Sequence, residues 1–345
     1  MNTQSPWWEK SAHSDRRPIL IARGRIKAAF RRWFEDREFV EVEAGQVQIS
    51  PGNETHLHGL RLTVHGNDAV ERPYYLHTSP EFACKKLLAA GETRIFDFAR
   101  VFRDRERGPL HAAEFTMLEW YRTRESYEHL MGDCAELLQL AAHAANVREL
   151  SYRGVTADPF ADLERLTLAE AFDRFAGVDL LSTTPDGVPD AGLMREQIRK
   201  AGIQTASDDT WGDMFSRVMV ERVDPNLGIG RPTILCEYPV CEAALARPKA
   251  SDPRVAERFE LFACGVELAN AFGELTDPAE QRRRFIADMD EKERIYGERY
   301  PLDEDFLAAL ASMPEASGIA LGFDRLVMLA TAAPHIDDVM WTPMR

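Results

Sequence analysis

The stretch Gly265-Val-Glu-Leu-Ala-Asn-Ala-Phe-Gly-Glu-Leu-Thr-Asp277 carries three polar side chains in a segment that otherwise has the pattern of a buried strand. These side chains are Glu267, Asn270 and Glu274. A buried carboxylate is costly unless it faces a cation. The stretch therefore predicts a strand whose polar residues contact a positively charged group.

Residues 259–263 form a second predicted strand, and Cys264-Gly265 occupies the place of a two-residue hairpin turn. Such a turn pairs residue 262 with 267 and residue 260 with 269. Glu260 and Glu267 then lie on one face as diagonal neighbours, roughly 7–8 Å apart, which is within reach of a shared Mg²⁺. The alternative is a pair of solvent-facing carboxylates, and the apolar residues around them argue against it.

Simple alternation along residues 266–274 places Asn270, Phe272 and Glu274 on the face opposite Glu267. A single pocket containing all four residues therefore requires a bulge or kink near Ala269.

Composition predicts a folded, cytoplasmic protein. The chain has 345 residues, of which 45% are hydrophobic, and it contains no apolar run of membrane-spanning length and no signal-peptide pattern. Its five cysteines include no Cys-x-x-Cys pair, so neither a disulfide framework nor a zinc site is indicated. The formal charge of −15 disfavours nucleic acid as a partner and suits a basic protein.

The order of predicted elements favours an α+β fold built on an antiparallel sheet flanked by helices. Residues 1–17 are expected to form a tail, and residues 18–345 one domain with a helical insertion at about 123–232. Helices are predicted at residues 19–38, 127–145, 168–175, 193–202, 211–223 and 278–296. Strands are predicted at residues 39–42, 74–77, 95–102, 115–121, 233–238, 259–263 and 266–269.

Two further segments carry residues suited to binding a nucleotide. In residues 114–121, alternation places Phe115, Glu119 and Tyr121 on one face, although an edge strand with a wet face explains the pattern equally well. Arg103, at the end of the preceding strand, could hold a phosphate, but a solvated loop arginine is the likelier reading of that residue alone. In residues 317–329, glycines precede a helix that opens with Asp324-Arg325, where an anion is favoured and Arg325 could stack on a purine; packing alone also explains such a turn.

In combination, Phe102-Arg103, His111, residues 114–121, Glu260, residues 267–277 and residues 318–328 resemble the class II lysyl-tRNA synthetases in the same order. The resemblance implies ATP and Mg²⁺ as cofactors and Arg103 and Arg325 as catalytic residues. It implies that Glu260 and Glu267 bind the metal. The residues implied to bind ATP are Arg103, Asp104, Arg105, His111, Ala112, Phe115, Glu267, Leu268, Gly322 and Arg325.

The same resemblance implies an amino-acid pocket, in which Glu81, Tyr121 and Glu274 surround a lysine-type ε-ammonium. The residues implied to bind the amino acid are Ser79, Pro80, Glu81, Glu119, Tyr121, Asn270, Phe272, Glu274 and Ala320. The chain departs from the family pattern at Arg105, where an acidic residue is usual, at Ala112-Ala113 within residues 111–114, and at Gly45 after Ala44.

Only about 17 residues precede the expected catalytic domain, so an anticodon-binding OB domain is not expected. In this respect, and at Ala320, the chain resembles the truncated paralogues that attach (R)-β-lysine to elongation factor P. That resemblance implies two-step acyl transfer through an adenylate, a homodimer, and a protein acceptor in place of tRNA. The alternatives are α-lysine as the substrate, tRNA or another acceptor, and a non-catalytic pseudo-synthetase.

Overall fold

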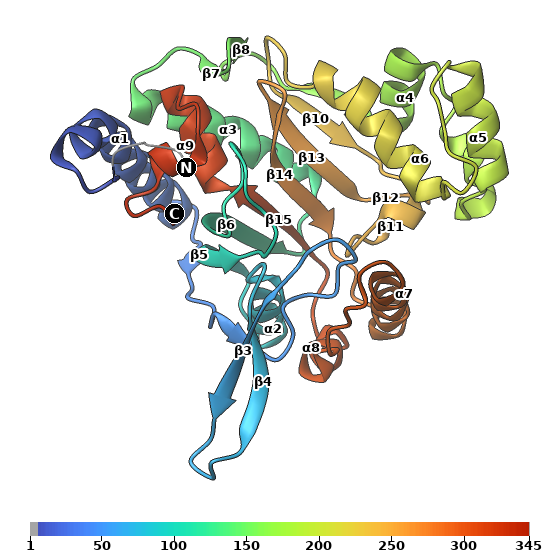
Figure 1. Ribbon diagram of the computed structural model, residues 1–345, viewed down its shortest axis with the longest axis horizontal. Coiled ribbons are helices and arrows are strands. Elements are labelled where there is room, and N and C mark those ends of the chain that lie inside the picture. The colour runs from blue at the N-terminus through green and yellow to red at the C-terminus, as the bar shows by residue number, and fades with distance from the viewer. Residues whose placement is uncertain (1–5, 345) are drawn as a thin grey trace.

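The computed structural model describes residues 6–344 and is built on one eight-stranded sheet (Figure 1). Its strands, in spatial order, are β1 (Val40–Glu41), β5 (Arg94–Phe102), β6 (Glu114–Thr123), β15 (Ala316–Gly322), β14 (Val266–Gly273), β13 (Arg258–Ala263), β10 (Thr233–Cys236) and β9 (Glu164–Thr167). Every pairing from β5 to β10 is antiparallel, whereas β1 and β9 join the two edges in parallel. The predicted antiparallel sheet is confirmed, with a parallel strand added at each edge.

The hairpin between β13 and β14 turns at Cys264 and Gly265, whose φ angles of 56° and 73° suit a two-residue turn with two positive φ values. Phe262 opposes Glu267 as predicted, but Leu261 opposes Ala269, so Leu268 is an extra residue in β14. The bulge predicted near Ala269 is therefore confirmed.

The bulge also corrects the predicted register, because Glu260 opposes Asn270 and not residue 269. Along β14, the half-buried side chains are Glu267, Asn270 and Phe272, with buried residues between them. This spacing brings the polar residues on both sides of the bulge to one face of the sheet.

Helices α1 (Lys10–Glu35), α3 (Glu128–Ala145) and α9 (Phe323–Thr331) share the largest apolar core with one face of the sheet (Figure 1). Phe34 stacks on Phe96 of β5 in this core, with ring centroids 4.4 Å apart. The tail predicted for residues 1–17 is wrong from Lys10 onward, since α1 begins there and contains Pro18. Proline removes one hydrogen bond from a helix, and the turns before Pro18 are held to the C-terminal segment, where Arg16 donates to the carbonyl oxygens of Asp337 and Met340.

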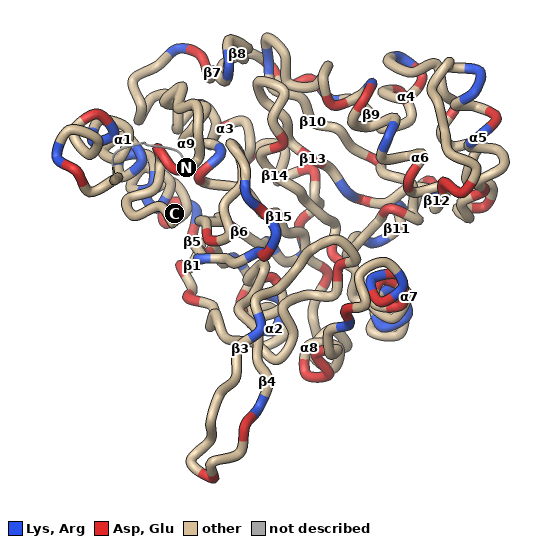
Figure 2. Tube along the Cα trace, in the orientation of Figure 1, with Lys and Arg blue, Asp and Glu red and all other residues tan. Residues whose placement is uncertain are grey.

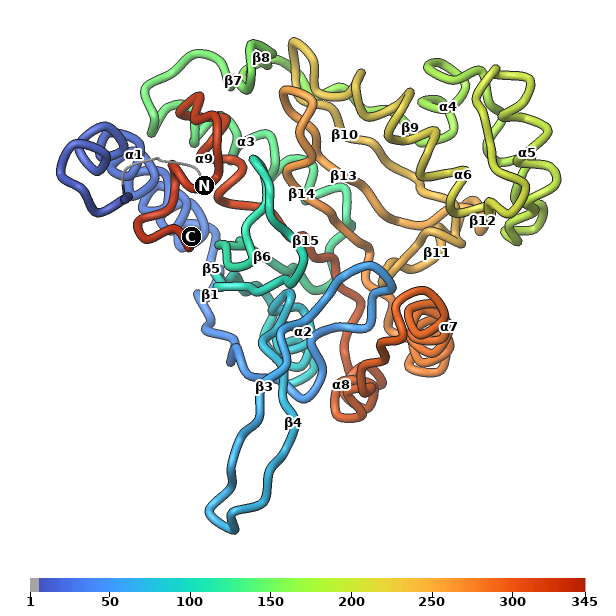
Figure 3. Tube along the Cα trace, in the orientation of Figure 1, coloured from blue at the N-terminus to red at the C-terminus, as the bar shows by residue number. Residues whose placement is uncertain are grey.

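The other face of the sheet is partly covered by α2 (Glu81–Ala89), α7 (Pro278–Tyr296) and α8 (Glu304–Leu310). Helix α7 has the predicted bounds: Asp277 caps its first turn, and Gly297, with a φ of 66°, ends it. A small sheet of β2 (Val47–Gln48), β4 (Glu71–Leu76) and β3 (Leu60–His65) lies beside α2, and its β3–β4 hairpin projects away from the body (Figure 3).

The predicted helical insertion is only partly helical. Helices α4 (Leu168–Ala176), α5 (Ala191–Lys200) and α6 (Trp211–Val218) build a separate apolar core beside β10. However, α3 belongs to the main core, and β7 (Leu150–Tyr152), β8 (Val155–Ala157) and β9 were missed. A further small pair is formed by β11 (Pro248–Lys249) and β12 (Asp252–Ala256).

Charged residues of both signs are interspersed along the chain, and on α7 they alternate closely (Figure 2). Within residues 6–344, none of the helices combines the length and apolar character needed to cross a membrane.

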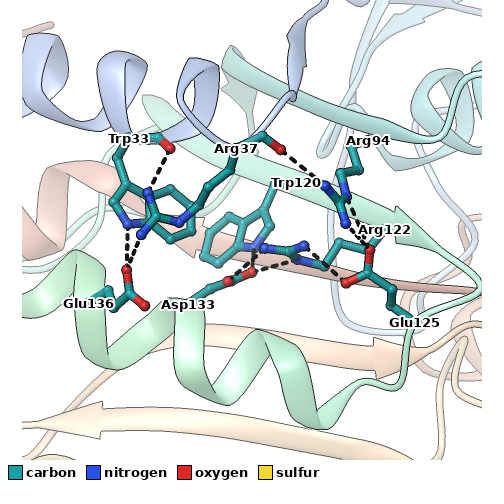
Figure 4. Close-up of polar contacts among 8 residues, drawn as sticks. All are labelled: Trp33, Arg37, Arg94, Trp120, Arg122, Glu125, Asp133 and Glu136. Carbon is teal, nitrogen blue, oxygen red and sulfur yellow. Dashed lines mark hydrogen bonds and ion pairs between the residues drawn. The ribbon is translucent and has the colours of Figure 1, made fainter.

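A buried ionic group joins α3 to the sheet (Figure 4). Asp133 of α3 accepts hydrogen bonds from the Trp120 indole at 2.9 Å and from two nitrogens of Arg122 at 2.9 and 2.8 Å. Its side chain is only 8% exposed. Beside it, Glu136 forms an ion pair with Arg37 on the surface, where its side chain is 53% exposed.

We predict that Asp133→Ala lowers the free energy of unfolding by about 3–5 kcal/mol, because the buried Arg122 guanidinium keeps only its contact with Glu125 and the buried Trp120 indole loses its acceptor. Glu136→Ala is the control: it removes an exposed ion pair and the acceptor of the Trp33 indole, so its cost should stay at about 1–2 kcal/mol. Urea unfolding followed by circular dichroism measures both values. Equal costs for the two variants would contradict this account of how α3 is held.

Candidate active site

Four of the predicted site residues lie in a transverse row across the sheet. Glu260 opposes Asn270, Asn270 opposes Ala320, and Ala320 opposes Glu119. Directly opposed residues in antiparallel strands project to the same face, so these four side chains share one surface. The structure thus brings together residues from β13, β14, β15 and β6.

A second row on the same face contains Phe272, Gly318 and Tyr121. A Cβ atom on Gly318 would lie 2.3 Å from Glu274 Oε1 and 2.3 Å from Tyr121 Cε1, which is closer than such atoms can approach. Gly318 therefore makes the space in which the side chains of Tyr121 and Glu274 meet.

Glu119 is buried and accepts two short hydrogen bonds. Ser79 Oγ donates to its Oε1 at 2.5 Å, and the Tyr121 hydroxyl donates to its Oε2 at 2.6 Å. Burial raises the pKa of Glu119 to about 8, and the nearby Glu81 carboxylate adds to that rise. Glu119 is therefore mainly neutral at pH 7 until a cation reaches it.

Glu81 and Glu274 meet around an ammonium group that belongs to the chain itself. Lys85 Nζ lies 2.5 Å from Glu81 Oε1 and 2.5 Å from Glu274 Oε2, and both Lys85 and Glu274 are 1% exposed. Pro80, the N-cap residue of α2, precedes Glu81. Lys85 was not foreseen from the sequence, since a Glu–Lys pair four residues apart on a helix usually lies on the surface.

Arg325, in the first turn of α9, contacts two other predicted nucleotide ligands. One of its nitrogens lies 2.9 Å from His111 Nε2, and another donates to the Glu267 carbonyl oxygen at 2.9 Å. The same guanidinium is 3.5 Å from the Glu267 carboxylate. Burial and the adjacent Arg325 lower the pKa of His111.

Arg103 lies 5.3 Å from the centre of the Phe115 ring and donates to the Thr78 carbonyl oxygen. The next residue, Asp104, donates its N–H to the His58 carbonyl oxygen at 2.7 Å. Arg105 instead forms an ion pair with Glu298, which follows α7. Arg105 is therefore occupied by a partner that the sequence analysis did not consider.

The remaining predicted nucleotide ligands have little side chain to offer. Ala112 and Leu268 are 3% and 2% exposed and pack in the main core, so only their backbones can face a ligand. Gly322 lies at the N-cap of α9. Ala320 packs against a small apolar cluster that includes Met117.

Glu260 and Glu267 have the chemistry of a magnesium site. Burial raises the pKa of Glu260 to about 7; Arg258, 2.7 Å away, opposes that rise, and Glu267 adds to it. Over residues 6–344, no three His, Cys, Asp or Glu side chains form a metal-binding cluster. Two carboxylates still suit Mg²⁺, which usually takes one or two carboxylates together with substrate phosphates and water.

Comparisons with known proteins agree with this geometry. The family model described as "tRNA synthetases class II (D, K and N)" matches residues 6–345. A protein of Sodalis glossinidius is 38% identical over 342 residues, 98% of each chain. One of Haemophilus ducreyi is 38% identical over 323 residues, 93% of this chain and 92% of the relative. One of Salmonella paratyphi B is 35% identical over 342 residues, 98% of each chain.

These three relatives carry one name, elongation factor P--(R)-beta-lysine ligase. Their similarity extends over nearly the full length of both chains, so it includes every element that builds the carboxylate pocket. The chain therefore belongs to the class II tRNA synthetases of the D, K and N group, and within it to the same family as these ligases.

Proposed function

We propose that the chain is an ATP-dependent ligase that adenylates (R)-β-lysine, or lysine, and transfers it to a lysine side chain of elongation factor P in the cytoplasm. The observation that carries this proposal is the carboxylate cluster of the buried Glu119 and Glu274 with the partly exposed Glu81, on the sheet face that also presents Glu260 and Asn270. Such a pocket suits an amino acid with an ammonium group.

In the first step, a carboxylate oxygen of the amino acid attacks the α-phosphorus of ATP and pyrophosphate leaves. Arg103, His111 and Arg325 would bind the phosphates and adenine, with Phe115 beside Arg103. When bound, Mg²⁺ neutralises phosphate charge, and Glu260 and Glu267 would hold it. Positioning and electrostatics supply most of the rate, so no side-chain nucleophile is needed.

In the second step, an unprotonated acceptor amine attacks the carbonyl carbon of the adenylate and AMP leaves. The pocket meanwhile holds the ammonium groups of the amino acid. Glu119 gives up its proton when an ammonium group arrives, and Asn270 offers a further acceptor. Asn270 Oδ1 is buried and has no hydrogen-bond partner within the part of the chain that the structure describes.

We also propose a homodimer through the region of β1 and β2. Three apolar side chains that lie close together in the sequence are exposed there: Val40 is 51% exposed, Val47 48% and Ile49 40%. Exposed apolar residues gathered in one region suit a protein interface.

We predict that Glu267→Gln and Arg325→Ala each reduce amino-acid-dependent ATP–pyrophosphate exchange by about 100-fold or more, because charge stabilisation at the phosphates is lost. Glu291→Gln and Arg283→Ala, on the exposed side of α7, are controls and should exchange at the wild-type rate. Thermal melting checks that all four variants fold. Wild-type exchange in either site variant would remove that residue from the site.

We predict that the KM for the amino acid falls as the pH rises from 6.5 to 8. Glu119, with a pKa of about 8, is mostly protonated at pH 6.5 and must lose its proton to pair with an ammonium group. Glu119→Gln cannot titrate, so this variant should show a flatter pH profile. Calorimetry in two buffers of different ionisation enthalpy should also show proton release on binding. A KM that rises over this range would contradict the assignment.

A further inference from the structure

Lys85 is an ammonium group built into the candidate amino-acid pocket. It lies on α2, is 1% exposed, and contacts Glu81 of its own helix and Glu274, the residue after β14, at 2.5 Å each. The next residue, Lys86, turns away from the pocket and forms an ion pair with Asp303 at 2.6 Å. Adjacent lysines on one helix therefore have different surroundings.

The ion pairs keep Lys85 charged. Burial alone would lower the pKa of Lys85, but the carboxylates of Glu274 and Glu81 outweigh that effect and raise it. A buried pair also fixes side-chain positions, since moving either partner leaves an uncompensated charge. Lys85 thus sets where Glu81 and Glu274 lie.

The cluster retains negative charge for a ligand. Even with Glu119 protonated, the two carboxylates of Glu81 and Glu274 outnumber the single ammonium group of Lys85. Residues 77–83, which include Glu81, line a narrow cavity together with residues 50–54. A ligand with ammonium groups neutralises the remaining negative charge of this cluster, whereas a ligand without them leaves carboxylates unpaired.

We propose that Lys85 is a positioning residue for amino-acid selection: it holds Glu81 and Glu274 in place and cancels part of their charge, so that the pocket takes amino acids with two ammonium groups at a fixed separation. Lys85 acts through the two carboxylates and touches no reacting atom. This inference rests on the proposed function.

The test compares Lys85→Met, Lys85→Arg and the control Lys86→Met in pyrophosphate exchange with β-lysine, lysine and ornithine. Lys85→Met should raise the KM of the preferred lysine isomer by about tenfold or more, with the KM for ATP unchanged. Its preference for lysine over ornithine, which is one methylene shorter, should fall by about fivefold or more. Lys86→Met should leave both quantities unchanged.

Adding Glu81→Gln to Lys85→Met removes one uncompensated carboxylate, so it should raise the melting temperature above that of Lys85→Met, while the amino-acid KM stays high because Glu81 itself belongs to the ammonium pocket. If Lys85→Met does not fold, Lys85→Arg decides: it keeps the cation but displaces the carboxylates, and should raise the amino-acid KM alone. If the wild type is active and the folded Lys85 variants have the same amino-acid KM as the wild type, this inference alone is overturned. A wild type that exchanges with none of the three amino acids overturns the proposed function as well.

Discussion

The cost of burying carboxylates governs the pocket face of the sheet. Glu119 and Glu274 are each 1% exposed, and neither could remain there without hydrogen-bond donors or a cation. Ser79 and Tyr121 supply donors to Glu119, while Lys85 supplies the cation for Glu274. The protein thus supplies only part of the hydrogen bonds and ion pairs that these carboxylates can form, and the ammonium group of a ligand can supply the rest.

Two features of the backbone make this arrangement possible. The extra residue Leu268 shifts the register of β14, so that Glu267 and Asn270 share a face despite lying three residues apart. Gly318 leaves an opening in β15 into which Tyr121 and Glu274 extend. Because the bulge lies between Glu267 and Asn270, it also joins the proposed nucleotide ligands to the proposed amino-acid ligands.

Much of this fold could be predicted from local patterns. The two-residue turn at Cys264-Gly265, the capped helix α7 and the strands β5 and β6 all have strong signals in the sequence. The need for a bulge followed from requiring one pocket, although its effect on the partner of Glu260 did not.

Other features depend on contacts that are distant in the sequence. The helical turns before Pro18, where a tail was predicted, depend on contacts of Arg16 with the carbonyl oxygens of Asp337 and Met340. The strand β9 is short and gains its stability from pairing with β10. Arg105 and Lys85 have partners, Glu298 and Glu274, that lie far along the chain, so neither ion pair could be foreseen from spacing.

In the proposed function, the carboxylate pocket binds a lysine-type amino acid that is then transferred to elongation factor P. The most direct measurement is the intact mass of purified elongation factor P after incubation with the protein, ATP, Mg²⁺ and (R)-β-lysine. We predict that its mass increases by one lysyl residue, and that a factor lacking the acceptor lysine is unchanged. An unmodified factor, in a mixture where pyrophosphate exchange shows that the adenylate forms, would contradict this account.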